Sequence, residues 1–315
     1  MLLCVLLSTA LLAGDEPSQP VDPSPAIDEP VEATSLRWFD KAHRLLSISG
    51  QASAQWFDGF FGPSDAADSA DAWLRLRLQQ QLFERDSNQF KARLSASFHL
   101  PQTKRRLKLL VESDPDGDLT DLRDLSDSSA NSSTRAALRW TPWDYQTWDL
   151  SFDAGITLDS GLDPFIRSRA RHFYAWDERT VIRLSQEVKG EAQDGWSETT
   201  RVVWERLFDD HGYRFSSRAK FGEQSAGLEW NVSLLRGFKL SDVSGIGVFY
   251  TVSGATRDQE DQSEIHRLGL NYRRNFLRSW LFYELEPQLT WPRKYQYQTN
   301  WELRLTLEAQ FGQRR

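Results

Sequence analysis

Residues 301–311 read Trp-Glu-Leu-Arg-Leu-Thr-Leu-Glu-Ala-Gln-Phe, a strict alternation of apolar and polar side chains. Successive side chains of a β-strand point to opposite faces, so this stretch predicts a strand with one apolar and one polar face. Residues 90–100 and 148–158 repeat the pattern. Strands of soluble proteins usually have about five or six residues, whereas strands that cross a membrane need about nine to eleven. The length of these segments therefore favours a membrane protein over a soluble β-sandwich.

Segments of this kind continue through most of the chain, and we count fourteen between residues 72 and 311. They predict an all-β fold, an antiparallel up-and-down transmembrane β-barrel of about 14 strands at residues 72–312, with 12 or 16 strands as alternatives. The expected strands lie near residues 72–83, 89–100, 104–113, 133–141, 146–158, 164–175, 179–189, 196–208, 212–222, 226–236, 245–254, 264–274, 278–290 and 298–311.

The expected connections alternate in length, which is an independent check on the strand count. Bacterial barrels place short turns in the periplasm and longer loops outside the cell. Most even-numbered connections are short, so the first strand is expected to start at the periplasmic side. The tenth connection, at residues 237–244, is longer than this alternation predicts.

The composition combines many tryptophans with a polar average. The chain has 13 Trp, a formal net charge of -7 and a mean hydropathy of -0.57. Its basic residues are scattered and give no electrostatic footprint for nucleic acid, so we exclude that class of partner. Tryptophan rings favour the headgroup level of a bilayer. We therefore expect an aromatic girdle beside the predicted periplasmic turns, made of Trp143, Trp148, Trp176, Trp204 and Trp280. The alternative is that these rings pack in the core of a soluble sandwich.

The first 71 residues do not share the strand pattern. Residues 1–14 have the short apolar run and small-residue exit of a secretory signal peptide, with a buried N-terminal helix as the alternative. Residues 15–34 are acidic and rich in proline, which predicts a disordered periplasmic linker. Residues 35–71 are expected to form a short periplasmic or plug-like element. The single cysteine, Cys4, lies in the signal, so the mature chain would hold neither a disulfide nor a thiolate metal site.

The span 72–311 resembles Gram-negative outer-membrane β-barrels. Such proteins end in a strand with alternating apolar residues and a terminal aromatic, which the barrel-assembly machinery reads. Leu307, Ala309 and Phe311 match this C-terminal assembly signal, although four residues follow the aromatic. The resemblance implies a bacterial outer-membrane location, contact with its lipid and lipopolysaccharide, and assembly by that machinery. The N-terminal segment could in addition bind a periplasmic partner.

The inward positions implied by the alternation are densely charged, and they carry the functional expectation. Arg167, Arg169, Arg171, Arg214 and Arg218 are expected to form a basic lumen wall, and Glu284, Glu286 and Glu302 an acidic one. Two interpretations stay open: a water-filled lumen whose field selects ions, or a lumen closed by salt bridges. The first predicts a porin-like channel for small polar or charged solutes. The second predicts a non-conducting structural or assembly barrel, and an outer-membrane hydrolase is a further alternative.

Evidence for a metal site or for catalysis is weak in the sequence. Asp114, Asp116 and Asp118 could present oxygens to Ca²⁺, but an EF-hand needs Gly at its sixth position and Glu at its twelfth, where this chain has Leu119 and Leu125. A solvated acidic loop is favoured, and no cofactor is expected. The five histidines, His43, His99, His172, His211 and His266, stand in no local nucleophile motif, so no catalytic residue is predicted.

Overall fold

The computed structural model describes residues 72–99, 107–113, 134–144, 147–158, 161–225, 227–257 and 260–312. The signal peptide, linker and plug-like element expected at residues 1–71 lie outside the described residues, and so does the acidic loop with Asp114, Asp116 and Asp118. Within the described ranges, no helix is long and apolar enough to cross a bilayer.

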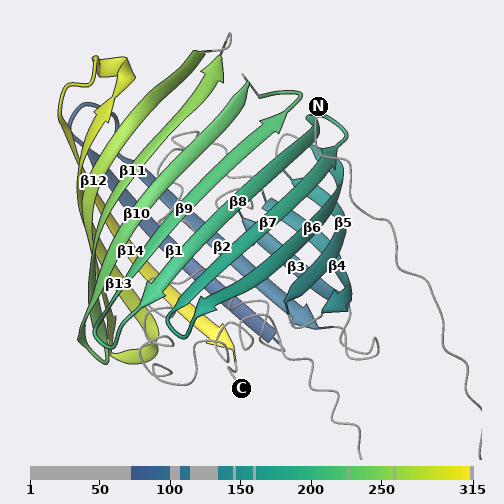
Figure 1. Cartoon of the computed structure of the whole chain (residues 1–315), viewed down its shortest axis with the longest axis horizontal. Coiled ribbons are helices and arrows are strands. Elements are labelled where there is room, and N and C mark those ends of the chain that lie inside the picture. Colours follow the sequence, from purple (N-terminus) through teal and green to yellow (C-terminus); the bar gives the residue numbers. More distant parts are fainter. Residues whose placement is uncertain are drawn as a thin grey trace, which may run out of the picture. The chain divides into compact units, whose positions relative to one another are not determined.

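Fourteen β-strands close into one antiparallel barrel (Figure 1). Each strand pairs with its neighbours along the chain, and the last strand returns to pair with the first. The prediction of a fourteen-stranded, all-β antiparallel barrel is confirmed. The strands are β1 (Ala72–Phe83), β2 (Gln89–His99), β3 (Leu107–Ser113), β4 (Thr134–Asp144), β5 (Trp148–Leu158), β6 (Leu162–Asp177), β7 (Thr180–Glu191), β8 (Gly195–Leu207), β9 (His211–Gly222), β10 (Leu228–Ser241), β11 (Ser244–Arg257), β12 (Glu260–Phe276), β13 (Arg278–Pro292) and β14 (Asn300–Gly312).

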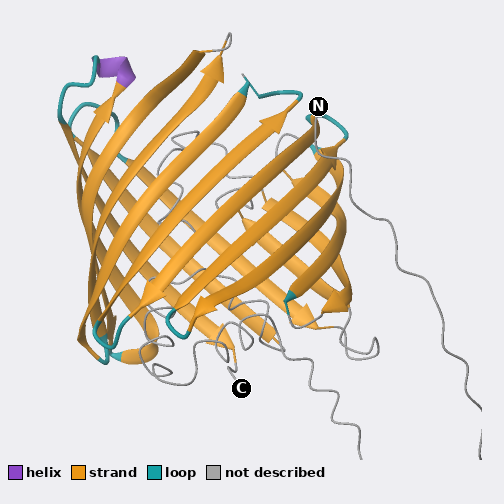
Figure 2. Ribbon diagram, in the orientation of Figure 1, coloured by secondary structure: helices purple, strands orange, loops and turns teal. Residues whose placement is uncertain are grey.

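The turns between strands differ at the two ends of the barrel. The even-numbered connections lie at one end, which we call the short-turn end, because five of the six have one to three residues: 145–147, 178–179, 208–210, 242–243 and 277. The sixth, residues 100–106 between β2 and β3, is longer. The opposite end, the loop end, carries connections of more varied length, from the two residues 258–259 to residues 293–299, which include the 3-10 helix η2 (Arg293–Tyr295) (Figure 2). Because short turns are periplasmic in bacterial barrels, the short-turn end is the expected periplasmic end.

The tenth connection corrects one expectation from the sequence. It comprises residues 242–243 rather than 237–244, because β10 continues to Ser241. Arg236 lies on the outer face and is followed by Gly237, and together they interrupt the apolar alternation that marks a strand. Phe238 and Leu240 resume the outer face beyond this interruption. The tenth connection is therefore short like most of the even-numbered ones, although the second, at residues 100–106, has seven residues and the odd-numbered eleventh, at residues 258–259, has two.

The two faces of the wall differ sharply, as β14 shows. Glu302, Arg304 and Glu308 are buried on its inner face, while Leu305 and Leu307 are each 39% exposed on its outer face. A soluble protein would reverse this arrangement, burying leucine and exposing charge. Apolar side chains directed outward and polar side chains directed inward are the pattern of a barrel that lies in lipid.

Aromatic side chains ring the outer face at the short-turn end. Trp148, Trp176 and Trp280 are exposed there, and Trp204 lies on the outer face of β8 near the same end. The ring centroid of Trp280 is 5.0 Å from that of Phe311, the aromatic of the expected assembly signal. The side chain of the fifth tryptophan expected there, Trp143, lies outside the described part of the structure.

A second set of outward tryptophans lies at the loop end, where the sequence had predicted none. Trp196 and Trp301 are the second residues of β8 and β14, and Trp291 lies near the end of β13. Trp196 and Trp301 are exposed, and the Trp196 ring lies 6.0 Å from that of Phe221. Two such bands, one at each end, match the two membrane–water interfaces.

Two loops meet at the loop end beside the seam between β1 and β14. Lys294 Nζ lies 2.7 Å from a carboxylate oxygen of Asp86, and the Tyr295 hydroxyl donates a hydrogen bond of 2.8 Å to the same carboxylate. The hydrogen bond that Lys294 donates to Asp86 lowers the pKa of the Asp86 carboxyl below its ordinary value and raises the pKa of Lys294 above its own. The contact between the two loops thus helps to hold the first strand beside the last, outside the membrane-spanning part of the barrel.

Substituting a lipid-facing leucine tests the position of the wall in the bilayer. Leu305 lies near the middle of β14, so Leu305→Arg should lower the free energy of unfolding in vesicles by about 2–4 kcal/mol, the cost of an arginine at the bilayer midplane. Leu240→Arg, near the end of β10, should cost about 0–1 kcal/mol. Denaturant titration followed by tryptophan fluorescence measures both. Equal losses at the two positions would contradict this placement.

The loop contact gives a pH-dependent contribution to stability. Asp86→Asn should lower the free energy of unfolding by less than about 1 kcal/mol at pH 7, because the ion pair with Lys294 is partly exposed. A carboxyl whose pKa is lowered on folding stabilises the fold above its ordinary pKa, and loses this contribution as the pH falls through the lowered value. The difference between wild type and variant should therefore vanish in strong acid. A difference that persists there would show that the charge of Asp86 is not involved.

Candidate functional site: the charged inner wall

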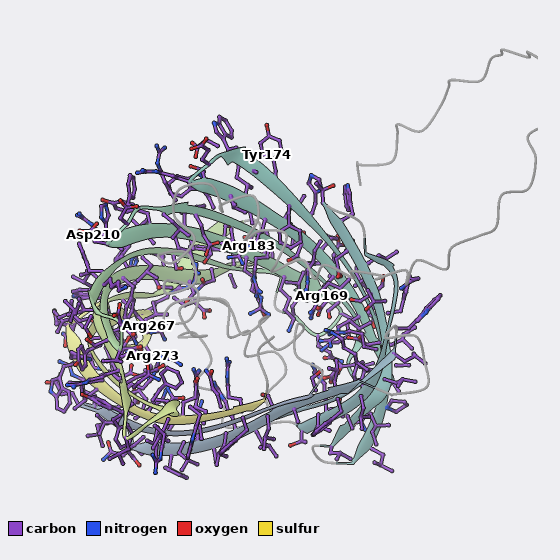
Figure 3. The ribbon with its side chains drawn as sticks, turned by 90° about the horizontal axis from the view of Figure 1, so that it is seen from below. Arg169, Tyr174, Arg183, Asp210, Arg267 and Arg273 are labelled. Carbon is purple, nitrogen blue, oxygen red and sulfur yellow. The ribbon has the colours of Figure 1, made fainter. Side chains whose placement is uncertain are left out.

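Charged side chains from almost every strand line the inner face of the barrel, which we call the inner wall. Figure 3 shows Arg169, Arg183, Arg267 and Arg273 on the inner side and Tyr174 on the outer side. Among the described residues, cationic side chains on the inner wall are nearly twice as numerous as anionic ones, although the whole chain has a net charge of -7. The cationic residues are Arg75, Arg77, Lys91, Arg93, Lys108, Arg135, Arg139, Arg167, Arg169, Arg171, Arg183, Lys189, Arg201, Arg214, Arg218, Lys220, Lys239, Arg267, Arg273 and Arg304. The anionic residues are Asp149, Asp153, Asp163, Glu187, Glu191, Glu205, Glu229, Glu284, Glu286, Glu302 and Glu308.

Glu308 connects three strands across the seam of the barrel. Its side chain is 0% exposed, and its carboxylate lies 2.5 Å from a nitrogen of Arg77 on β1 and 2.8 Å from one of Arg273 on β12. Arg273 also contacts Glu284 on β13 at 2.7 Å. A buried carboxylate needs such partners, because an uncompensated charge in a low dielectric costs several kcal/mol. The cluster therefore holds the first strand against the last.

The three residues of the expected acidic wall lie together on β13 and β14. Arg304 Nη1 is 2.8 Å from a carboxylate oxygen of Glu286, and its Nη2 is 3.3 Å from one of Glu302. Glu284 contacts an arginine of β12, as described above. Each of the three carboxylates thus has an arginine beside it on the same stretch of wall. Opposite charges alternate between neighbouring positions here, instead of facing one another across the lumen.

A second charged cluster joins β4, β5, β6 and β7. Asp153 on β5 accepts hydrogen bonds of 2.8 Å from the Nε atoms of Arg139 on β4 and Arg167 on β6. One position further along β6, on the same face, Arg169 Nε donates a hydrogen bond of 2.8 Å to Glu187 on β7. The strand register produces these contacts, since Arg139 and Arg167 both lie directly opposite Asp153.

A third cluster continues around the wall on β7, β8 and β9. Glu205 on β8 lies between Arg183 on β7, at 2.7 Å, and Arg214 on β9, with which it also forms an ion pair. Arg214 is among the most buried side chains of the described chain. Ion pairs thus link each strand from β4 to β9 to a neighbour, which cross-links the wall in addition to its backbone hydrogen bonds.

The five predicted basic residues occupy two strands, Arg167, Arg169 and Arg171 on β6 and Arg214 and Arg218 on β9. The register connects them through a residue that the sequence pattern did not single out. Arg171 lies opposite Ser185, Ser185 opposite Arg201, and Arg201 directly opposite Arg218. These three arginines, which we call the basic row, lie at one level of the inner wall. Only the pairing of β8 with its neighbours shows the row.

Of the histidines whose side chains the structure describes, His172 and His266 lie on the outer face and His211 begins β9 beside a turn. His172 Nδ1 is 3.1 Å from the backbone oxygen of Thr147, and His266 Nδ1 is 2.8 Å from the Tyr250 hydroxyl. In the described parts of the chain, no three or more His, Cys, Asp or Glu side chains are grouped so that they could hold a metal ion. The possible Ca²⁺ ligands Asp114, Asp116 and Asp118 lie outside those parts.

A closed barrel with an apolar outer face, aromatic rings at both ends and a charged interior has the features of one class of membrane protein. The chain is an outer-membrane β-barrel. This assignment rests on the strand pairing and on the two unlike faces of the wall.

No model of a known protein family matches the chain, and no curated protein matches it. Solved structures of outer-membrane proteins are similar to the barrel at low identity. A loop L8 deletion mutant of OmpT from Vibrio cholerae is 10% identical, with 77% of this chain and 99% of that chain covered and a TM-score of 0.47. The outer-membrane channel DcaP of Acinetobacter baumannii is 11% identical, with 77% and 97% covered and a TM-score of 0.47. The KdgM porin in complex with disordered oligogalacturonate is 8% identical, with 75% and 99% covered and a TM-score of 0.36.

Glu308→Gln tests the contribution of the seam cluster. The substitution removes one of the two carboxylates that Arg77 and Arg273 share and leaves only Glu284, so it should lower the free energy of unfolding by up to about 3–5 kcal/mol. Glu302→Gln on the same strand is the matched control, because its ion pair with Arg304 joins two residues of β14 and spans no seam. Denaturant unfolding and heat-modifiable migration on a gel measure both variants. Equal losses would show that Glu308 has no special role in closure.

Proposed function

We propose that the barrel is a channel for small charged solutes across the bacterial outer membrane, and that its inner wall favours anions. The observation that carries this proposal is the excess of cationic side chains on the inner wall of a chain whose net charge is negative. Rings of charged side chains set the selectivity of pores through their field, and arginine or lysine suits anions.

The basic row is the part of the wall that should matter most for selectivity. Arg201 and Arg218 lie directly opposite one another on β8 and β9, which concentrates positive potential at one level of the lumen. An anion that passes this level would meet the two guanidinium groups together.

A non-conducting barrel is the second candidate, and a specific observation favours it. Glu284, Glu286 and Glu308 are at most 2% exposed, and each contacts an arginine. Such pairing is typical of a wall in which charges neutralise one another rather than contact a passing solute. The function of that barrel would be structural or in envelope assembly.

Single-channel recording in planar bilayers distinguishes the two candidates. The folded chain should conduct, and its reversal potential in a KCl gradient should show preference for chloride. Arg201→Gln with Arg218→Gln should move the permeability ratio of anion to cation toward one, because two positive charges leave the inner wall. Arg274→Gln with Arg278→Gln removes the same charge from exposed positions at the short-turn end, and should leave the ratio unchanged.

Absence of conductance above background, from chain shown to be folded by heat-modifiable migration, would reject the channel and favour the structural barrel. Conductance with a preference for potassium would keep the channel and reject the anion preference. An equal effect of the inner and outer pairs of substitutions would show that selectivity depends on total charge rather than on the inner wall.

A further inference from the structure

Three arginines lie among aromatic rings on the outer side of the barrel at the short-turn end. We call this group the outer basic patch. Its members come from β8, β9 and β10 and from the turns that follow β6 and β8. It comprises Arg179, Arg206, Arg236, Phe208, Tyr213 and Phe238. All three arginines are exposed. The inner wall does not include any of them, so the patch is separate from the proposed channel.

Two of the guanidinium groups share one ring. The Cζ atoms of Arg179 and Arg206 lie 5.7 and 5.6 Å from the centroid of Phe208. His211 stacks on the same ring, with centroids 4.6 Å apart and an angle of 8° between the planes. A cation over an aromatic face is attracted by the ring quadrupole, so Phe208 restrains both arginines at the rim.

The third guanidinium lies between two rings on neighbouring strands. Arg236 Cζ is 4.7 Å from the centroid of Phe238 and 5.2 Å from that of Tyr213. The register places Tyr213 directly opposite both Arg206 and Arg236. The two arginines therefore flank one tyrosine on the same face of the sheet, at the same level of the barrel.

The nearest carboxylates do not neutralise the patch by direct contact. Within the described residues, the guanidinium groups of Arg179, Arg206 and Arg236 form no ion pair with an aspartate or glutamate within 4.0 Å, although Asp177 interacts electrostatically with Arg206 and Asp210 with Arg236 at longer range. Asp210, labelled on the outer side in Figure 3, instead lies 2.6 Å from His211 Nδ1. The guanidinium groups thus keep hydrogen-bond donors available to a ligand from outside the barrel.

The level of the patch indicates which ligand it meets. Arg206 precedes the last residue of β8, and the same end carries the exposed rings of Trp148, Trp176 and Trp280. Amphipathic rings and basic side chains at such a level lie among lipid headgroups. Guanidinium groups match the geometry of phosphate oxygens and bind them by paired hydrogen bonds.

We propose that the outer basic patch is a binding site for the phosphate group of an anionic phospholipid in the leaflet at the short-turn end. Phe208, Tyr213 and Phe238 hold the guanidinium groups in place, and their apolar edges contact the first carbons of the acyl chains. The site holds the barrel at a fixed depth in its membrane. It is independent of whether the lumen conducts.

Competitive lipid retention tests this site on the full folded chain. The chain is placed in nanodiscs of phosphatidylglycerol and phosphatidylcholine in equal amounts, released, and analysed by native mass spectrometry. Wild type should retain phosphatidylglycerol in preference to phosphatidylcholine. Arg206→Gln with Arg236→Gln should weaken this preference by about fivefold for each arginine, the change that corresponds to about 1 kcal/mol per basic residue at an anionic surface.

Arg274→Gln with Arg278→Gln is the matched control, since it removes the same charge at the same end, outside the patch. This control should keep most of the preference, and heat-modifiable migration should show that all chains are folded. Phe208→Leu keeps every charge and should still weaken retention, because the ring restrains two arginines. An equal loss of the phosphatidylglycerol preference in the control and in the patch variant would show that only general surface charge matters, and would contradict a specific site. If the wild type retained both lipids equally, the proposal would also be contradicted, and an acidic protein would be the next ligand to test.

Discussion

The need to satisfy every backbone polar group inside a bilayer determines the rest of this structure. Lipid offers no hydrogen-bond partner, so a spanning sheet must pair its first strand with its last. β1 and β14 meet this need over nearly their whole lengths. Closure then gives every strand an inner and an outer face, and the alternation of the sequence follows from this division.

Closure also explains where the strongest side-chain interactions lie. Glu308 is on the last strand, and its partners Arg77 and Arg273 are on the first strand and on β12. A register slip by one residue would turn Glu308 toward lipid and a leucine toward the charged interior. The ion pairs therefore specify which register closes the barrel. These ion pairs are expected to add little to the total free energy of unfolding, compared with well-packed apolar residues at the same positions.

Much of the fold could be predicted because a period of two and a strand length above nine residues are properties of the sequence itself. The fourteen strands follow from that pattern. The pattern ended the tenth strand too early, at Arg236 and Gly237, because an arginine on the outer face at headgroup level interrupts the apolar alternation that marks a strand. The partners of Glu308 and the row of Arg201 and Arg218 were hidden for a different reason. They depend on the register between strands, which no single segment contains.

Arg201 and Arg206 show how one strand supplies both sites. They are five residues apart on β8, so the period of two places the first on the inner wall and the second on the outer face. Arg201 lies opposite another arginine inside the barrel, and Arg206 lies over a phenylalanine ring at the rim. The chemical group is the same, but one guanidinium meets what enters the lumen and the other meets lipid. Position relative to the sheet, rather than residue type, therefore determines the function that each arginine can have.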